Sequence, residues 1–256
     1  MKLAIIQNQW TPLQQEYIQT ALKEIELLFV ETINDCLSIK EPFLLFSSSL
    51  EAYNFSKKHH FPFLGFGLSL PCPYLVEDIE GLSDSYLTLV YARFYHLPFV
   101  LYQSKDFTIR EYHTLEFTKV KALYEVFTEN ESVTSFSKNE SIALEQFSSR
   151  ITEYRYKNHG FWGIFHANED LIGQIGITDY ENGLELSYMI HPDFQRKGIA
   201  FELCQKVLTY AKEELAITSL DIRISPSNIA SIKLAEKLQN TKIINLILKK
   251  QGTTPK

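Results

Sequence analysis

A short basic segment with one glycine is the part of the sequence best suited to bind a charged ligand. Residues 188–200 read YMIHPDFQRKGIA, with Arg196 and Lys197 directly before Gly198. The pattern predicts a strand, a loop and then an amphipathic helix. The first turn of a helix presents unpaired backbone N–H groups and the positive end of its dipole. Because glycine allows close approach, the segment can bind a phosphate or pyrophosphate largely through its main chain.

An ordinary strand–loop–helix connection with two solvated cations is the alternative interpretation of this segment. Two strings favour the binding role. Gln195-x-x-Gly198-x-Ala200 resembles the Q/R-x-x-G-x-G/A signature of the GNAT superfamily of acetyl-CoA-dependent N-acetyltransferases. Residues 228–238, NIASIKLAEKL, resemble the second cofactor segment of that family, N-x-x-S-x-x-L-x-E-K-L.

The resemblance implies how acetyl-CoA, the expected co-substrate, is held. Backbone amides from Arg196 to Ala200 would bind its pyrophosphate, and the backbone of Met189 and Ile190 would pair with the pantetheine arm where two central strands part. Asn228 is also a plausible helix N-cap, and both roles can hold together. The cofactor-binding residues predicted in this way are Met189, Ile190, Gln195, Arg196, Lys197, Gly198, Ile199, Ala200, Asn228 and Ser231.

The activity that the resemblance implies is transfer of an acetyl group to a primary amine of a small molecule or a peptide N terminus, by direct attack. An ammonium has no lone pair, so the site needs a base, and the leaving thiolate needs a proton or a stabilising donor. Glu185 is the candidate base because it matches a glutamate in part of the family; a solvent-facing carboxylate is the alternative.

The general acid is less clearly marked. Many family members have a tyrosine where this chain has Ala235. Tyr188, Tyr180 or no side chain at all can serve instead; Tyr188 is the better placed, and an aromatic side chain packed in the sheet is the alternative for it. Ala235 also motivates a second hypothesis, a non-catalytic acyl-CoA-binding sensor or adaptor.

Residues 106–256 are predicted to form the domain that carries these motifs. Strands are expected at 107–112, 161–165, 171–178, 184–190, 220–224 and 243–248, and helices at 115–127, 141–157, 200–215 and 229–238. Turn signals between the three central strands indicate antiparallel pairing. This element order is also that of the GNAT family. We therefore expect an α+β fold with a mixed, mostly antiparallel sheet flanked by helices.

Residues 1–105 are predicted to form a small α/β domain. The pattern favours helices over 11–34, 50–60 and 84–96, and strands at 43–46, 62–66 and 74–76. The domain faintly resembles Rossmann-like and haloacid-dehalogenase-like folds but lacks an aspartate nucleophile, a G-x-G-x-x-G string and a Walker loop. Ser47–Ser49 are expected to cap a helix. Shaping the acceptor site, docking on the second domain and mediating dimerisation stay open as roles.

The net charge and the cysteine and histidine spacing limit the partners and metal sites that we expect. The formal net charge is −6 over 256 residues, so neither a nucleic acid nor an anionic membrane surface is an expected partner. The three cysteines lie far apart, and no histidines have ligand spacing, so neither a disulfide framework nor a metal site is expected. With no signal peptide and no apolar run of roughly 18 residues, we expect a cytoplasmic protein. The acceptor amine, the acyl chain length and a homodimer stay open.

Overall fold

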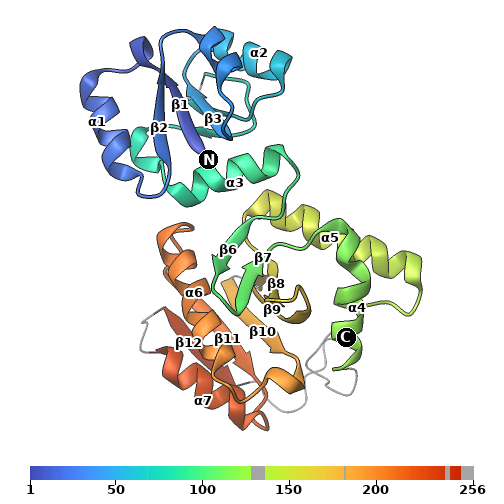
Figure 1. The fold of residues 1–256 in the computed structure, drawn as a ribbon. Helices are drawn as coiled ribbons and strands as arrows, with labels where there is room; N and C mark the ends of the chain where they lie inside the picture. The colour runs from blue at the N-terminus through green and yellow to red at the C-terminus, as the bar shows by residue number, and fades with distance from the viewer. Residues whose placement is uncertain (68, 128–135, 182, 240–242, 249–256) are drawn as a thin grey trace. The chain divides into compact units, whose positions relative to one another are not determined.

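The computed structural model describes residues 1–67, 69–127, 136–181, 183–239 and 243–248 and divides into two compact units, Met1–Phe99 and Val100–Lys256 (Figure 1). This division falls slightly before the boundary expected between residues 105 and 106. The reason is β6 (Val100–Gln103), a strand not expected from the sequence, which pairs with β7 (Phe107–Arg110). Within the described residues, no helix is long and apolar enough to cross a membrane.

A seven-stranded sheet forms the centre of the second unit, in the order β12-β11-β10-β9-β8-β7-β6. The strands β8 (Phe161–His166), β9 (Leu171–Tyr180) and β10 (Gly183–Ile190) form antiparallel pairs. β11 (Leu220–Ile224) runs parallel to both β10 and β12 (Ile244–Leu248). The mixed, mostly antiparallel sheet and the element order expected for residues 106–256 are therefore confirmed.

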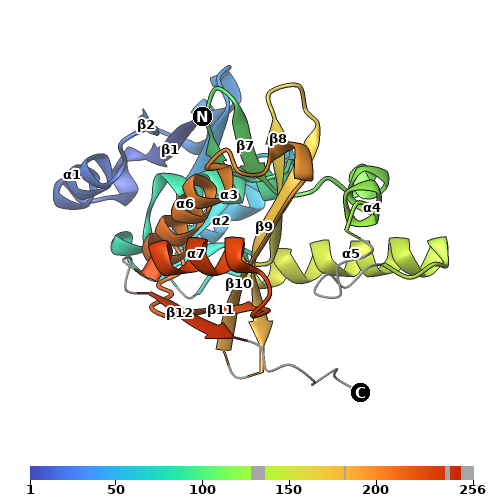
Figure 2. The same ribbon diagram turned by 90° about the horizontal axis from the view of Figure 1, so that it is seen from below.

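Helices cover both faces of this sheet (Figure 2). On one face, α4 (Phe117–Glu125) and α5 (Glu140–Lys157) pack on a buried aromatic cluster that also contains Met189 of β10. On the other face lie α6 (Ile199–Glu213) and α7 (Ile229–Leu238). The apolar stripe of α6, which includes Leu203 and Val207, is buried against the sheet, as the helical spacing predicts.

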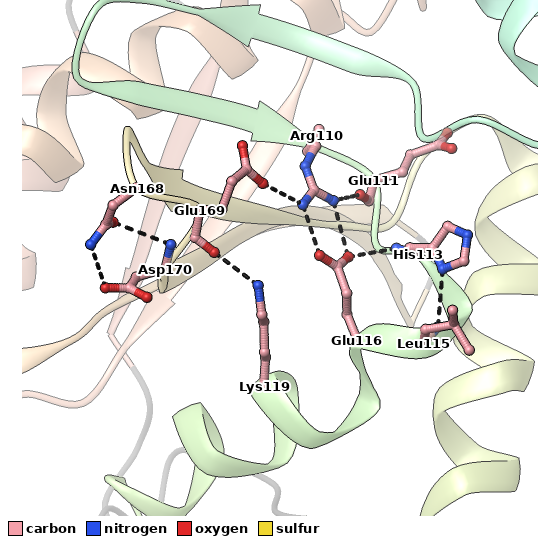
Figure 3. A network of polar contacts seen from close by, with 9 residues as sticks. All are labelled: Arg110, Glu111, His113, Leu115, Glu116, Lys119, Asn168, Glu169 and Asp170. Atoms are coloured by element: carbon pink, nitrogen blue, oxygen red, sulfur yellow. Dashed lines mark hydrogen bonds and ion pairs between the residues drawn. The ribbon is translucent and has the colours of Figure 1, made fainter.

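A cluster of charged residues ties β7 to α4 and to the turn between β8 and β9 (Figure 3). Arg110 donates to the two carboxylate oxygens of Glu116 at 2.7 and 3.0 Å and to Glu169 at 3.2 Å. Its guanidinium lies 3.6 Å from the ring centroid of Phe165. Lys119 donates to the carbonyl oxygen of Glu169 at 2.9 Å. The cluster therefore fixes the start of α4 against the sheet.

A five-stranded parallel sheet, in the order β2-β1-β3-β4-β5, forms the centre of the first unit. Its strands are β1 (Lys2–Ile6), β2 (Glu26–Val30), β3 (Phe43–Ser47), β4 (Phe63–Phe66) and β5 (Leu75–Val76), and its helices are α1 (Pro12–Ala21), α2 (Leu50–His59) and α3 (Asp84–Phe94). The small α/β unit expected from the sequence is present, with β1 and β2 as additional strands.

The prediction of one helix over residues 11–34 was wrong. The helix ends at Ala21, and residues 26–30 form β2, which pairs with β1. The Asp84 carboxylate accepts hydrogen bonds from the backbone N–H groups of Lys23, Glu24 and Ile25, at 2.8 to 3.2 Å. A side chain distant in sequence thus satisfies the backbone just after α1, where the helical pattern would have continued.

Two serines at the end of β3 and just after it have structural roles. Ser49 caps α2, because its hydroxyl accepts from the backbone N–H of Ala52 at 3.3 Å. The fully buried Ser47 donates to the side chain of Gln9 at 2.6 Å and accepts from the backbone N–H of Ser49 at 3.0 Å. The expectation that this serine segment caps a helix is confirmed.

Candidate functional site

The loop between β10 and α6 leaves a row of backbone donors unused. Arg196 and Gly198 adopt positive φ angles of 61° and 82°. Gly198 is the N-cap of α6 and supplies no side-chain oxygen to the first turn. In the described part of the chain, the backbone N–H groups from Arg196 to Phe201 make no hydrogen bond. These donors and the helix dipole form a ready site for an anion.

Glycine is required at position 198 for its conformation and keeps the site open. A φ of 82° lies in the left-handed region, which side-chain-bearing residues rarely adopt. A Cβ placed there would meet no atom within 4 Å, so the space in front of the helix start is clear. Exposed Arg196 forms no ion pair within the described residues, and its charge is therefore available to a ligand.

Gln195 shapes the loop. Its carboxamide donates to the carbonyl oxygen of Ile190 at 2.8 Å and so fixes the loop against the end of β10. The ammonium of Lys197 lies 5.2 Å from the ring centroid of Phe194. The signature glutamine therefore positions the backbone that would hold a ligand.

The strands β10 and β11 part beside this loop. Their ladder has the pair Glu185↔Asp221, after which β10 continues to Ile190 and β11 to Ile224 without a further registered pair in the described residues. A cleft of about 530 Å³, called the strand cleft below, opens between the strands, the loop and α7. It is lined by all the predicted cofactor-binding residues except Lys197: Met189, Ile190, Gln195, Arg196, Gly198, Ile199, Ala200, Asn228 and Ser231.

The start of α7 forms one wall of the strand cleft. The Asn228 side chain accepts from the backbone N–H of Ser231 at 3.1 Å, so the predicted N-cap is confirmed. One turn apart on the same helix, the exposed residues Lys233 and Lys237 also line the cleft. This second basic group was not predicted from the sequence, although the i, i+4 spacing of the two lysines indicates that they share one face of the helix.

The two candidate catalytic side chains lie on opposite faces of β10, because side chains alternate along a strand. Tyr188 faces α6 and α7, and its hydroxyl is buried next to Ser231. Burial raises the pKa of Tyr188 to about 12. The phenol therefore keeps its proton at neutral pH. The Tyr188 ring packs in the sheet, as the alternative interpretation of this residue expected. Because Tyr188 also lines the strand cleft, its role as the general acid stays a prediction.

Glu185 shares its face of β10 with Ser187 and Met189. Its side chain is 14% exposed and lies 3.8 Å from Nε of Arg223, so it is not the solvent-facing carboxylate of the alternative interpretation. Arg223 also contacts Asp221 at 3.2 Å and lies 3.8 Å from the ring centroid of Tyr180. Tyr180, the other acid candidate, is thereby engaged by the same guanidinium.

A second cavity, of about 520 Å³, lies on the α4–α5 face of the sheet. Tyr124, Arg150, Glu153, Tyr154, Lys157, His159, Gln174, Asp179 and Met189 are among the residues that line it. This cavity was not predicted from the sequence, because its walls come from separate elements and share no sequence motif. In the described residues, no group of three or more His, Cys, Asp or Glu could hold a metal ion.

The fold and the site define a class of protein. An α+β sheet parts between two parallel strands, and a helix N-terminus with free amides and three nearby cations, Arg196, Lys233 and Lys237, borders the gap. Residues 187–189 of β10 line both the strand cleft and the second cavity. Such a domain can hold an extended anionic molecule and expose one end of it to a second substrate.

The comparisons with known proteins identify the family. The acetyltransferase (GNAT) domain model matches residues 107–240. The uncharacterized N-acetyltransferases YnaD and YoaA of Bacillus subtilis are 27% and 26% identical over 138 and 143 residues, which cover 53% and 52% of this chain and 79% and 81% of theirs. A putative GNAT-family acetyltransferase of known structure from Bordetella pertussis aligns at a TM-score of 0.47 with 19% identity, over 54% of this chain and 86% of its own.

The chain belongs to the GNAT acetyltransferase family. The resemblance read from residues 195–200 and 228–238 is thereby confirmed. The protein is an acetyltransferase enzyme that takes its acetyl group from acetyl-CoA, the co-substrate of this family. The free amides of residues 196–201 fit the pyrophosphate of that co-substrate, because they point a concentrated set of donors into open space.

Proposed function

We propose that this enzyme transfers the acetyl group to a primary amine, of a small molecule or a peptide N terminus, by direct attack. The row of unused N–H groups from Arg196 to Phe201, at the mouth of the strand cleft, carries the proposal. It would hold the pyrophosphate, and the cleft would lead the thioester toward Met189. Arg196, Lys233 and Lys237 would add charge attraction to the phosphates.

The amine would enter through the second cavity. Ser187, Tyr188 and Met189 line both spaces, so an acceptor in the cavity can reach a thioester in the strand cleft. The carboxylates of Glu153 and Asp179 line the cavity and suit a cationic amine. They also contact Lys157, which moderates the attraction.

Glu185 is the proposed base, directly or through a water molecule, since it lines the strand cleft and lies on the same face of β10 as Ser187 and Met189, which line both spaces. It would remove the proton that an ammonium must lose. The amine nitrogen then bonds to the thioester carbon, the C–S bond breaks, the nitrogen gives up a second proton to become the amide, and the thiolate takes up a proton.

Isothermal titration with acetyl-CoA tests the cofactor site, with Gly198→Asp as the variant. The new carboxylate would repel phosphates where the amides converge, and we expect affinity to fall by at least about 100-fold. Gly67→Asp is the matched control: Gly67 also has a positive φ, of 81°, a Cβ there also meets no atom within 4 Å, and the residue lies outside the strand cleft. Equal affinity in the two variants would remove the loop from the proposal.

A non-catalytic acyl-CoA sensor or adaptor is the second candidate function. Ala235, at the position of the family's usual tyrosine acid, is fully buried and offers no proton donor to the cleft. The discriminating experiment measures thiol release from acetyl-CoA over a panel of amines. Release that depends on one amine establishes transfer, whereas saturable binding without release by any amine favours the sensor.

A further inference from the structure

Three buried side chains form a line of hydrogen bonds that ends at the wall of the second cavity. The Tyr112 hydroxyl donates to Oε1 of Gln174 at 3.2 Å, and Nε2 of Gln174 donates to the hydroxyl oxygen of Tyr124 at 2.8 Å. Nη1 of Arg150 donates to the same Tyr124 oxygen at 3.0 Å. Tyr112, Gln174 and Tyr124 are each at most 6% exposed, which shields these bonds from bulk water.

The direction of these bonds follows from counting hydrogens. Burial raises the pKa of Tyr112 well above its ordinary value, so this phenol keeps its hydrogen and needs an acceptor. Oε1 of Gln174 supplies one. If the Gln174 amide were turned over, its NH₂ group would face Tyr112, and the buried Tyr112 hydrogen would lose that acceptor at a cost in free energy. The orientation with Oε1 toward Tyr112 is therefore favoured.

This arrangement leaves the hydroxyl hydrogen of Tyr124 without a protein acceptor. The Tyr124 oxygen accepts from Gln174 and from Arg150, and no acceptor for its own hydrogen lies within reach in the described parts of the chain. Tyr124 lines the second cavity, so this hydrogen is available to a bound molecule. The two donors on the oxygen, one of them a cation, polarise the O–H bond.

The position of Tyr124 along the sheet matches the point where the strand cleft and the second cavity meet. Gln174 of β9 pairs with Met189 of β10 in the antiparallel ladder. Tyr124 and Met189 belong to one buried cluster, and Met189 lines both spaces. An acetyl group brought through the strand cleft as far as Met189 would therefore end beside Tyr124.

We propose that Tyr124 is a catalytic residue that donates a hydrogen bond to the carbonyl oxygen of the acetyl group. As the amine nitrogen bonds to the carbonyl carbon, the π electron pair moves onto this oxygen. The hydrogen bond from Tyr124 stabilises this charge. The electron pair returns when the C–S bond breaks, the amine nitrogen gives up a proton to become the amide, and the leaving thiolate takes up a proton. The inference rests on the proposed transfer to an amine.

Tyr124→Phe tests this role, because it removes the hydroxyl and keeps the ring. With an amine identified in the panel above, we expect kcat to fall on the order of 100-fold while KM for acetyl-CoA changes little. Tyr102→Phe is the matched control: it removes a hydroxyl that donates to Glu202 at 3.3 Å, outside both spaces, and we expect it to retain the wild-type kcat.

A spectroscopic measurement separates a catalytic role from a structural one. The infrared carbonyl band of bound acetyl-CoA, labelled with carbon-13 at the carbonyl, should lie at lower wavenumber in the wild type and in Tyr102→Phe than in Tyr124→Phe. An unchanged band, or an unchanged kcat, in Tyr124→Phe would overturn the inference. If the wild type binds acetyl-CoA but acetylates no amine, the proposed transfer fails, and the band comparison still decides whether Tyr124 contacts the carbonyl.

Discussion

The charged cluster around Arg110 and the loop from Gln195 to Ala200 use the same kinds of groups in opposite ways. In the cluster, the Arg110 guanidinium donates to Glu116, Glu169 and the carbonyl oxygen of Glu111, and its side chain is 13% exposed. In the loop, Arg196 is exposed without an ion pair in the described residues, next to backbone donors that are also unused.

This difference separates stability from binding. A donor that already has a protein acceptor stabilises the fold and has little left to offer a ligand, whereas an unused donor contributes nothing to folding and keeps its capacity for a ligand. The contrast predicts that substitutions at the two sites have opposite signatures. Stability should depend on the Arg110 cluster and cofactor affinity on the loop.

Arg110→Ala should give the largest effect. It leaves the Glu116 carboxylate, itself 12% exposed, without its main partner. Breaking a fully buried ion pair costs about 3 to 5 kcal/mol of unfolding free energy, and this partly buried pair should cost about 2 to 3 kcal/mol. Urea denaturation followed by circular dichroism measures the loss. Where the variant is still folded, its acetyl-CoA affinity should equal that of the wild type, and a loss confined to affinity would contradict the comparison.

Arg196→Ala should lower the affinity for acetyl-CoA and leave the stability unchanged, the reverse of Arg110→Ala. Its effect in free energy should also be smaller. One charge-assisted contact to a phosphate contributes about 1.5 kcal/mol, so we expect roughly tenfold weaker binding of acetyl-CoA. Unfolding free energy should stay within about 0.5 kcal/mol of the wild type, because the side chain is exposed and unpaired. Titration calorimetry and urea denaturation on the same preparation decide both points; a large loss of stability would show that the loop also supports the fold.

The anion-binding loop of the strand cleft could be predicted from the sequence because its parts are local, whereas the parting of β10 and β11 was expected only from the family resemblance. The free amides, Gly198 and the start of α6 come from one continuous segment, and the cap at Asn228 joins residues three apart. Such features depend on short-range geometry, which neighbouring residues in the sequence determine. Even so, the sequence did not show that Gln195 turns back to Ile190.

The remaining features depend on contacts between residues far apart in the chain. The end of α1 is set in part by Asp84, 61 residues beyond Lys23, so helical spacing alone placed a helix where β2 lies. The pairing of Gln174 with Tyr124 spans 50 residues, and nothing near Tyr124 in the sequence marks it as a cavity residue. A pattern read along the chain cannot show which distant side chains meet.

The pH dependence of stability gives the smallest and most specific test of the Arg110 cluster. Burial raises the pKa of Glu116, but the hydrogen bonds from Arg110 and the backbone N–H of His113 outweigh it, and the net pKa lies below the ordinary 4.5. A carboxyl whose folded pKa is depressed contributes stability above pH 4.5, and that contribution is lost as the pH falls through the lower folded value.

Glu116→Gln removes this titration, so the difference in unfolding free energy between wild type and variant should be constant near neutral pH and shrink below pH 4.5. Urea denaturation of both proteins from about pH 7 to about pH 3 measures it, and subtraction cancels the other acidic groups. Glu202→Gln, on exposed surface outside the cluster, is the control and should track the wild type. A difference that does not change with pH would mean that Glu116 supports the cluster through its shape and neutral hydrogen bonds, and the contrast with the loop would then be one of packing and not of charge.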